Sequence, residues 1–259
     1  MQAPTIESSP TTQPRPDVSQ AETAEVAWKP LYRIGAVAAL ISVAIVFIAA
    51  IVFIVWPPPS FQPTTNAVID WFKFFQDNAF LGLLDLDLGM LVGQALSVLI
   101  MLALYVVLRR VSPSFTAIAL AFSLMGAVLY FAANQAFSML FLSGQYAAAT
   151  TDAQRASFAT TGQTLLTIYQ GTPFDVSYIL GAIATLIFSA VMLRSAIFGK
   201  ATAYVGILTG VLMLVPANAG TLGLILSLLS LVPLIIWDIL IACKLFQLGN
   251  AALKAQSIS

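Results

Sequence analysis

Seven polar side chains set within apolar stretches are the residues of this sequence best suited to hold a ligand. They comprise three carboxylates, two amides and two phenols: Asp87, Gln94, Tyr130, Asn134, Asp175, Tyr178 and Asp238. All but Asp238 lie on three apolar runs that we expect to be neighbouring helices. A carboxylate beside amide and phenol groups suits a cationic ligand, so these residues predict an outward-facing polar pocket between three helices.

Helix capping is the alternative role for Asp87 and Asp175. Each opens an apolar run, where the helix dipole stabilises a negative charge. Tyr130 and Asn134 share a helix face by their i,i+4 spacing, yet such groups can simply bond neighbouring helices. Both interpretations stay open.

Asp238 is the candidate charge inside the membrane. A charged group at the bilayer centre costs roughly 2.5 to 3.5 kcal/mol on insertion scales, which makes such a residue a functional candidate. However, Lys244 follows within about 9 Å along a helix, and Trp237 is typical of the membrane interface. The sequence therefore favours an interfacial or ion-paired Asp238.

Other chemistry has little support in the sequence. There is no His, and Cys243 is the only Cys, which removes the commonest general base and any thiolate metal site. No catalytic triad, phosphate-loop or Walker pattern is present. These observations favour a protein that is not an enzyme and has no metal or cofactor, and the net charge of zero gives no indication of a nucleic-acid partner.

The elements that position these residues are membrane helices. The chain of 259 residues is 59% apolar and 8% charged, whereas soluble proteins carry about 25% charged residues. The sequence predicts an all-α, polytopic membrane protein with a transmembrane domain over 28–249, between a disordered cytoplasmic tail over 1–27 and a short cytoplasmic tail over 250–259. Its six spans are expected at about 34–56, 86–108, 114–142, 174–194, 201–216 and 221–248.

The distribution of basic residues predicts that both termini are cytoplasmic. The segments then assigned to the outside contain only Lys73 and Arg155. The cytoplasmic segments contain nine basic residues: Arg15, Lys29, Arg33, Arg109, Arg110, Arg194, Lys200, Lys244 and Lys254. We therefore expect an N-in/C-in protein of the bacterial cytoplasmic membrane, with the lipid bilayer as its first partner.

Two outer segments are expected to be helical without spanning the membrane. Residues 63–80 place Val68, Phe72, Phe75 and Ala79 on one stripe, which predicts an amphipathic helix lying in the outer interface. The polar outer loop over 143–171 is expected to be helical over 147–166, with breaks at its glycines, Gly162 and Gly171.

Two GxxxG patterns indicate close helix contacts. Gly89 and Gly93 form one, and Gly206 and Gly210 the other. Small residues at this spacing let helix backbones approach closely in lipid. Either pair is a possible contact with a helix partner.

Several short motifs resemble a known family, over about Tyr32 to Gly249. They include Gln145-Tyr146-Ala147, Tyr169-Gln170-Gly171-Thr172, Ser177-Tyr178-Ile179-Leu180-Gly181, Met192-Leu193-Arg194-Ser195, Phe198-Gly199-Lys200 and Leu229-Ser230-Leu231-Val232-Pro233. The chain is similar to a bacterial six-helix membrane family, the domain of unknown function numbered four-three-eight-six.

That family has no assigned activity, so the resemblance implies a fold and no site residues. Asp238 stands where it leads us to expect an uncharged residue. We therefore expect a structural or partner- and lipid-binding membrane protein, and alternatively a small transporter or ligand-binding protein that uses the outer polar pocket.

Overall fold

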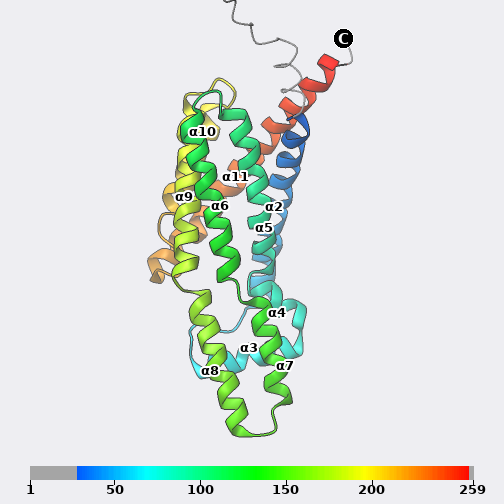
Figure 1. Cartoon of the computed structure of the whole chain (residues 1–259), viewed down its shortest axis with the longest axis vertical. Helices are drawn as coiled ribbons and strands as arrows, with labels where there is room; N and C mark the ends of the chain where they lie inside the picture. Colours follow the sequence, from blue (N-terminus) through cyan, green and yellow to red (C-terminus); the bar gives the residue numbers. More distant parts are fainter. Residues whose placement is uncertain (1–27, 257–259) are drawn as a thin grey trace, which may run out of the picture.

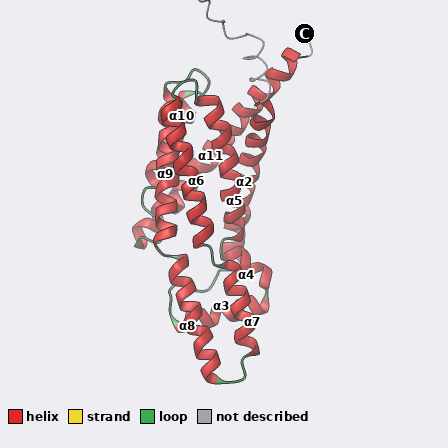
Figure 2. Ribbon diagram, viewed as in Figure 1, coloured by secondary structure: helices red, strands yellow, loops and turns green. Residues whose placement is uncertain are grey.

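Apolar runs of about 20 residues become long helices in the computed structural model, which describes residues 28–256 (Figure 1). That part of the chain is helical and contains no strand (Figure 2). The predicted tail over 1–27 and the last residues, 257–259, lie outside the described residues. The last helix continues through residues 250–256 of the predicted short tail, which stays a prediction.

Five helical stretches are long and apolar enough to cross a membrane. They are Pro30–Val55, Leu88–Leu108, Pro113–Ala148, Asp152–Leu193 and Gly220–Asn250. The third and fourth, with 36 and 42 residues, are longer than the roughly 20 residues that a bilayer requires. Each of these two stretches therefore includes residues beyond those that a single crossing needs.

Six helices pack in sequence order and close into a ring, the membrane bundle. Each contacts the next, and the last contacts the first. In order these helices are α2 (Lys29–Val55), α5 (Leu88–Leu108), α6 (Pro113–Ala133), α9 (Thr172–Leu193), α10 (Lys200–Leu212) and α11 (Gly220–Gln256). α10 is the shortest member, with 13 residues, or about 20 Å at 1.5 Å per residue.

The second GxxxG pattern lies inside this ring. A Cβ added at Gly206 would collide with the side chains of Ser189 and Trp237, and one at Gly210 would lie 2.6 Å from Cγ of Leu186. Only glycine allows α10 to pack so closely on α9 and α11. This face is therefore occupied within the chain, whereas a partner for the Gly89 and Gly93 face stays a prediction.

Four shorter helices form a second unit at one end of the bundle, the outer unit (Figure 1). Its own core contains aromatic and aliphatic side chains from three of them and from the adjoining Leu86, and the partly buried Leu83 of the remaining one packs against this core. The helices are α3 (Thr65–Asp77), α4 (Ala79–Asp85), α7 (Ala136–Ala148) and α8 (Asp152–Tyr169).

The predicted amphipathic helix is α3, but its apolar stripe does not face lipid. Val68 and Phe72 are 0% exposed, and Phe75 is 2% exposed. They pack against α7 and α8. The expected interfacial placement of this stripe is therefore wrong, because the neighbouring helices bury it.

The predicted third span is wrong in one respect, since it breaks at Asn134. The Asn134 side chain accepts a hydrogen bond from the backbone N–H of Ala136 at 3.1 Å and donates one to the carbonyl of Leu86 at 2.9 Å. This local bonding competes with helical bonding and separates α6 from α7.

The outer loop over 143–171 also differs from expectation. α8 starts at a capping box formed by Thr151 and Gln154 and runs without interruption through Gly162. At Gly162 an added Cβ would collide with side chains of α3, Val68 and Phe72, so this glycine serves packing. The predicted break at Gly171 is confirmed, because it is the N-cap of α9.

Candidate functional site

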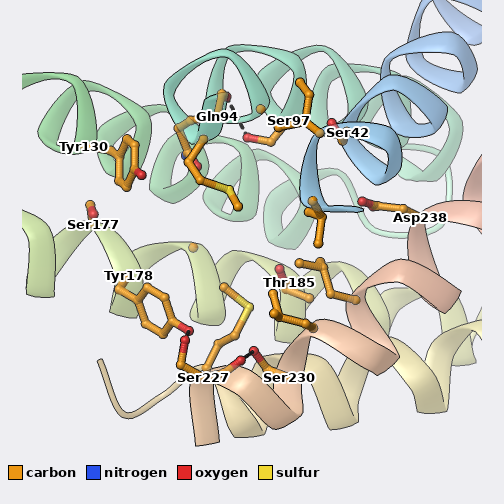
Figure 3. A pocket seen from close by; sticks show the side chains of 18 of the residues that line it. Ser42, Gln94, Ser97, Tyr130, Ser177, Tyr178, Thr185, Ser227, Ser230 and Asp238 are labelled. Carbon is orange, nitrogen blue, oxygen red and sulfur yellow. Dashed lines mark hydrogen bonds between the residues drawn. The ribbon is translucent and has the colours of Figure 1, made fainter. Parts of the chain in front are cut away.

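A cavity of about 360 Å³ lies within the ring of the membrane bundle. Its lining comes from α2, α5, α6, α9 and α11, with Met213 directly after α10 and Ala217 in the following loop. Figure 3 shows Tyr130 and Ser177 at one end of the cavity and Asp238 and Ser42 toward the other. The volume is within the range of small-molecule sites.

The cavity extends from the outer end of the bundle to its middle. Asp87 precedes α5, and Ala217 follows α10, at the outer end. Ser42 and Ser123 also line the cavity and lie halfway along α2 and α6. A group at the deep end is therefore surrounded by helices about halfway through the bundle.

Asp87 anchors the outer end of the cavity. Its carboxylate accepts a hydrogen bond from the Tyr130 hydroxyl at 3.3 Å and another from the Tyr169 hydroxyl. Phe174 packs beside both tyrosine rings, with centroids 6.1 and 6.2 Å away. Residues from α5, α6, α8 and α9 are thereby joined where the bundle meets the outer unit.

The backbone at Asp87 explains why capping does not account for this residue. Asp87 has φ of 66°, the only positive φ among the non-glycine residues described. Although it occupies the N-cap position of α5, its side chain makes no capping hydrogen bond. Asp tolerates the left-handed conformation better than most residues, and here that conformation accompanies a carboxylate bonded to two tyrosines.

Burial raises the pKa of Asp87, and the hydrogen bonds from Tyr169 and Tyr130 oppose this shift. Asp85 lies nearby at the end of α4 and is 7% exposed. Burial, followed by the charge of Asp87, raises the pKa of Asp85 to about 6. Two neighbouring carboxyl groups, Asp87 at the outer end of the cavity and Asp85 beside it, therefore have a pKa above the usual value for Asp.

Asp238 lies at the deep end of the cavity, and the expected ion pair of Asp238 is absent from the described residues. The residue is 7% exposed and lines the cavity. Within the described part of the chain it has neither an ion-pair partner nor a hydrogen-bond partner, so Lys244 does not neutralise it. The spacing along α11 predicted an ion pair between Asp238 and Lys244, but the Asp238 side chain lines the cavity inside the ring.

Five side chains with hydroxyl, amide or carboxyl groups that line the cavity make no side-chain hydrogen bond to the described residues, and the buried Nε1–H of Trp237 has no partner there either. The five side chains are Ser42, Gln94, Ser123, Thr185 and Asp238. Ser42 Oγ is fully buried. Buried polar groups in proteins nearly always have a partner. A hydroxyl, an amide or a cation placed in the cavity would supply the missing partners.

The other polar groups of the lining are partly satisfied. The Tyr178 hydroxyl donates to Ser227 Oγ at 2.9 Å, and Ser230 Oγ donates to the carbonyl of Ser227 at 2.7 Å. Ser97 Oγ donates to the backbone carbonyl of Gln94 at 2.8 Å. The side-chain amide of Gln94 has no partner among the described residues. The bond from Tyr178 to Ser227 joins α9 to α11, whereas the other two bonds lie within α11 and within α5.

The structure brings together most of the residues singled out from the sequence. The same cavity is lined by Asp87, Gln94, Tyr130, Tyr178 and Asp238. Asp238, expected elsewhere, joins the pocket residues because α11 closes the ring. The cavity thus involves more helices than the three predicted.

Asn134 and Asp175 do not line this cavity. Asn134 bridges the α6–α7 break to Leu86. Asp175 lies in the first turn of α9, where the helix dipole favours a negative charge, and its Oδ1 is buried without a partner among the described residues.

Sequence reasoning missed the small hydroxyl residues of the lining. These are Ser42, Ser97, Ser123, Thr185, Ser227 and Ser230. Single Ser and Thr residues are common in membrane helices, so each alone carries little signal. Their alignment on faces that meet inside the ring depends on how the helices pack. Tyr169 was missed as well, because Asp87 is distant from it in sequence.

No group of three or more His, Cys, Asp or Glu side chains in residues 28–256 is arranged to hold a metal ion. Fold and site together define a class: a helical protein with five helices suited to cross a membrane, built around an internal cavity lined by apolar side chains with a few polar groups among them. The domain of unknown function DUF4386 matches residues 70–249, and the chain belongs to this family.

The matched region begins within α3 and ends in α11, so α2 precedes it. Comparison with curated proteins and with solved structures finds no match. The function must therefore be argued from the cavity itself.

Proposed function

We propose that this protein binds a small molecule inside the membrane, in the cavity of the six-helix ring. The observation that carries the proposal is the set of five polar side chains that face the cavity without partners. A protein whose bundle served only as a structural support would be expected to pair such groups or replace them with apolar ones. This favours the ligand-binding or transporting role over a structural or partner-binding one.

The same proposal includes six membrane crossings and cytoplasmic termini. α10 forms one wall of the ring, which supports a sixth crossing although this helix is short. The ends of α5 and α9 and the start of α10 lie at one end of the bundle (Figure 1), and their basic residues are there: Arg109, Arg110, Arg194 and Lys200. By the positive-inside rule this end faces the cytoplasm of the bacterial inner membrane.

In this orientation the cavity begins at the outer side, at Asp87, and reaches the membrane centre at Ser42. Reporter fusions provide the test of topology. Fusions after Arg110, Lys200 and Ser259 should report the cytoplasm, and fusions near Asp77 and Asp152 the outside. A fusion at Lys200 that reports the outside would contradict the proposed orientation and the sixth crossing.

Ligand binding is tested by filling the cavity. Gly181 lines it, and an added Cβ there meets nothing within 4 Å. Gly144 on α7 is the matched control, since its Cβ also meets nothing but it is exposed in the outer unit. Gly181→Leu should occupy the cavity, and Gly144→Leu should leave it unchanged.

The purified protein in a neutral detergent is offered a panel of lipids and metabolites, and binding is measured by thermal shift. We expect compounds that stabilise the wild type and Gly144→Leu but not Gly181→Leu. If no compound stabilises the wild type, or if Gly181→Leu responds like the wild type to every compound, the cavity is not a binding site and the proposed function is wrong.

A further inference from the structure

The two carboxylates that line the cavity, Asp87 and Asp238, differ in their hydrogen bonding. Asp87 accepts hydrogen bonds from Tyr130 and Tyr169. Asp238 has no partner in the described residues. A positive group that binds in the cavity would therefore be drawn to Asp238, where nothing else compensates the charge.

Among the described residues, no Lys or Arg side chain lines the cavity. The nearest basic residue along α11 is Lys244, and it makes no ion pair with Asp238. The two ion pairs described, Lys73 with Asp70 and Arg155 with Asp152, lie in the outer unit at exposed positions. The electrostatic potential of the cavity is thus set by carboxylates, and it favours a cation.

The surroundings of Asp238 suit an organic cation better than a metal ion. The next residue, Trp237, is 1% exposed and contributes to the lining, as do the apolar side chains of Leu234 and Met101. Aromatic rings attract alkylammonium groups strongly when water is excluded. Metal ions instead require several carboxylate, imidazole or thiolate ligands, and no such cluster occurs in residues 28–256.

We propose that the ligand is a small organic monocation, of the alkylammonium type, whose positive group binds at Asp238. This inference rests on the proposed function, because it names the ligand class of the same cavity. The positive group pairs with the Asp238 carboxylate beside Ser42. The remainder of the molecule extends toward Gln94 and Ser123, whose polar groups lack partners.

The test compares two probes of the same shape that differ in charge. Choline carries a trimethylammonium group, and 3,3-dimethylbutan-1-ol carries a tert-butyl group in its place. Both have the hydroxyl that the polar lining can bind. Dissociation constants are measured by calorimetry on the full chain in a neutral detergent.

The wild type should bind choline more tightly than the alcohol by roughly tenfold or more, because the attraction between opposite charges is strong where water is excluded. Asp238→Asn should remove this preference and leave the affinity for the alcohol within about twofold, since the variant keeps the size of the side chain. Asp77→Asn is the control, because it removes an exposed carboxylate of the outer unit, and it should keep the preference.

The inference is overturned if the wild type binds both probes equally, or if Asp238→Asn still prefers choline. In either case, loss of binding in Gly181→Leu would show that the cavity is a binding site, and the proposed function would stand. If neither probe binds the wild type, the inference fails, and the lipid and metabolite panel alone decides the proposed function. If Gly181→Leu binds both probes unchanged, the probes bind outside the cavity and the inference fails as well.

Discussion

Each end of the cavity contains an Asp carboxylate, but only the one at the outer end is hydrogen-bonded. At the outer end, two tyrosine hydroxyls donate to Asp87, which joins the bundle to the outer unit. At the deep end, Asp238 is 7% exposed and has no partner in the described residues. The difference indicates that the outer carboxylate stabilises the fold, whereas the inner one costs stability that only a function would justify.

The largest effect is expected from Asp87→Ala. This change leaves the hydroxyls of Tyr130 and Tyr169 without their acceptor and places Ala in a left-handed conformation. We expect the free energy of unfolding to fall by about 3 kcal/mol, since hydrogen bonds to charged groups contribute roughly 1.5 to 3 kcal/mol each.

Thermal and denaturant unfolding in detergent measure this loss, and Asp87→Asn is the control. Asn retains one acceptor oxygen and tolerates the left-handed backbone, so it should lose clearly less. Equal stability of Asp87→Ala and the wild type would mean that the outer carboxylate does not hold the fold.

Asp238→Asn should change stability in the opposite direction. Replacing an unpartnered buried carboxylate with a neutral amide removes a cost of burial, so the ligand-free protein should gain about 1 to 2 kcal/mol. The measurement is the unfolding midpoint without ligand. Asp77→Asn, an exposed position, should stay within about 0.5 kcal/mol of the wild type. A loss of stability in Asp238→Asn would reveal a partner for the carboxylate and would remove the contrast between the two ends.

Tyr130→Phe and Tyr169→Phe sharpen the account of the outer end. Each removes one hydroxyl that donates to Asp87, and each should cost about 1.5 kcal/mol. Tyr204→Phe, at an exposed tyrosine, is the matched control and should have little effect. In the Asp87→Ala background both costs should largely disappear, and a double-mutant cycle measures this coupling. Costs that persist without the carboxylate would show that the hydroxyls act through other contacts.

The smallest effect concerns pH and Asp85. Its pKa is about 6 in the folded protein, against an ordinary 3.8, so the folded state binds the proton more tightly than the unfolded state. Stability from this group is fully present below pH 3.8 and is lost as the pH rises through 6. Between pH 5 and pH 7.5 the loss should be about 1 kcal/mol.

Melting temperatures at the two pH values measure this effect, and Asp85→Asn should show a smaller difference than the wild type. Asp87→Asn should also reduce the difference, because the charge of Asp87 contributes to the raised pKa of Asp85. If the pH dependence of Asp85→Asn equals that of the wild type, the titrating group lies elsewhere.

Several features of the fold could be predicted from single residues and their neighbours along the chain. Proline and glycine mark three helix boundaries. They are the start of α6 at Pro113, the end of α2 before Pro57 and the break at Gly171. The break at Asn134 also has a local cause, in the bond from Asn134 to Ala136. It was missed because Asn in an apolar run is equally compatible with a continuous helix.

The site could be predicted only in part. One cavity is lined by Asp87, Gln94, Tyr130 and Tyr178, and the helices that carry them follow one another around the ring. The ion pair expected for Asp238 is absent from the described part of the chain, because α11 packs on α2 at the closure of the ring and the carboxylate lies toward Ser42 (Figure 3). The prediction relied on Lys244, six positions further along α11, and this spacing does not indicate which other helices pack around Asp238.

The sequence by itself determined the apolar spans, because a helix in lipid must satisfy its backbone internally and be covered by apolar side chains over about 20 residues. The sequence also showed which connections between the spans carry basic residues, because this depends on local composition and not on helix packing. Only the tertiary structure decided that α7 and α8 cover the stripe of α3, that Gly206 and Gly210 pack within the chain, and that Asp87 and Asp238 face one cavity. These depend on the rotation and tilt of each packed helix, which a pattern of apolar residues constrains weakly when lipid and protein interior are both apolar.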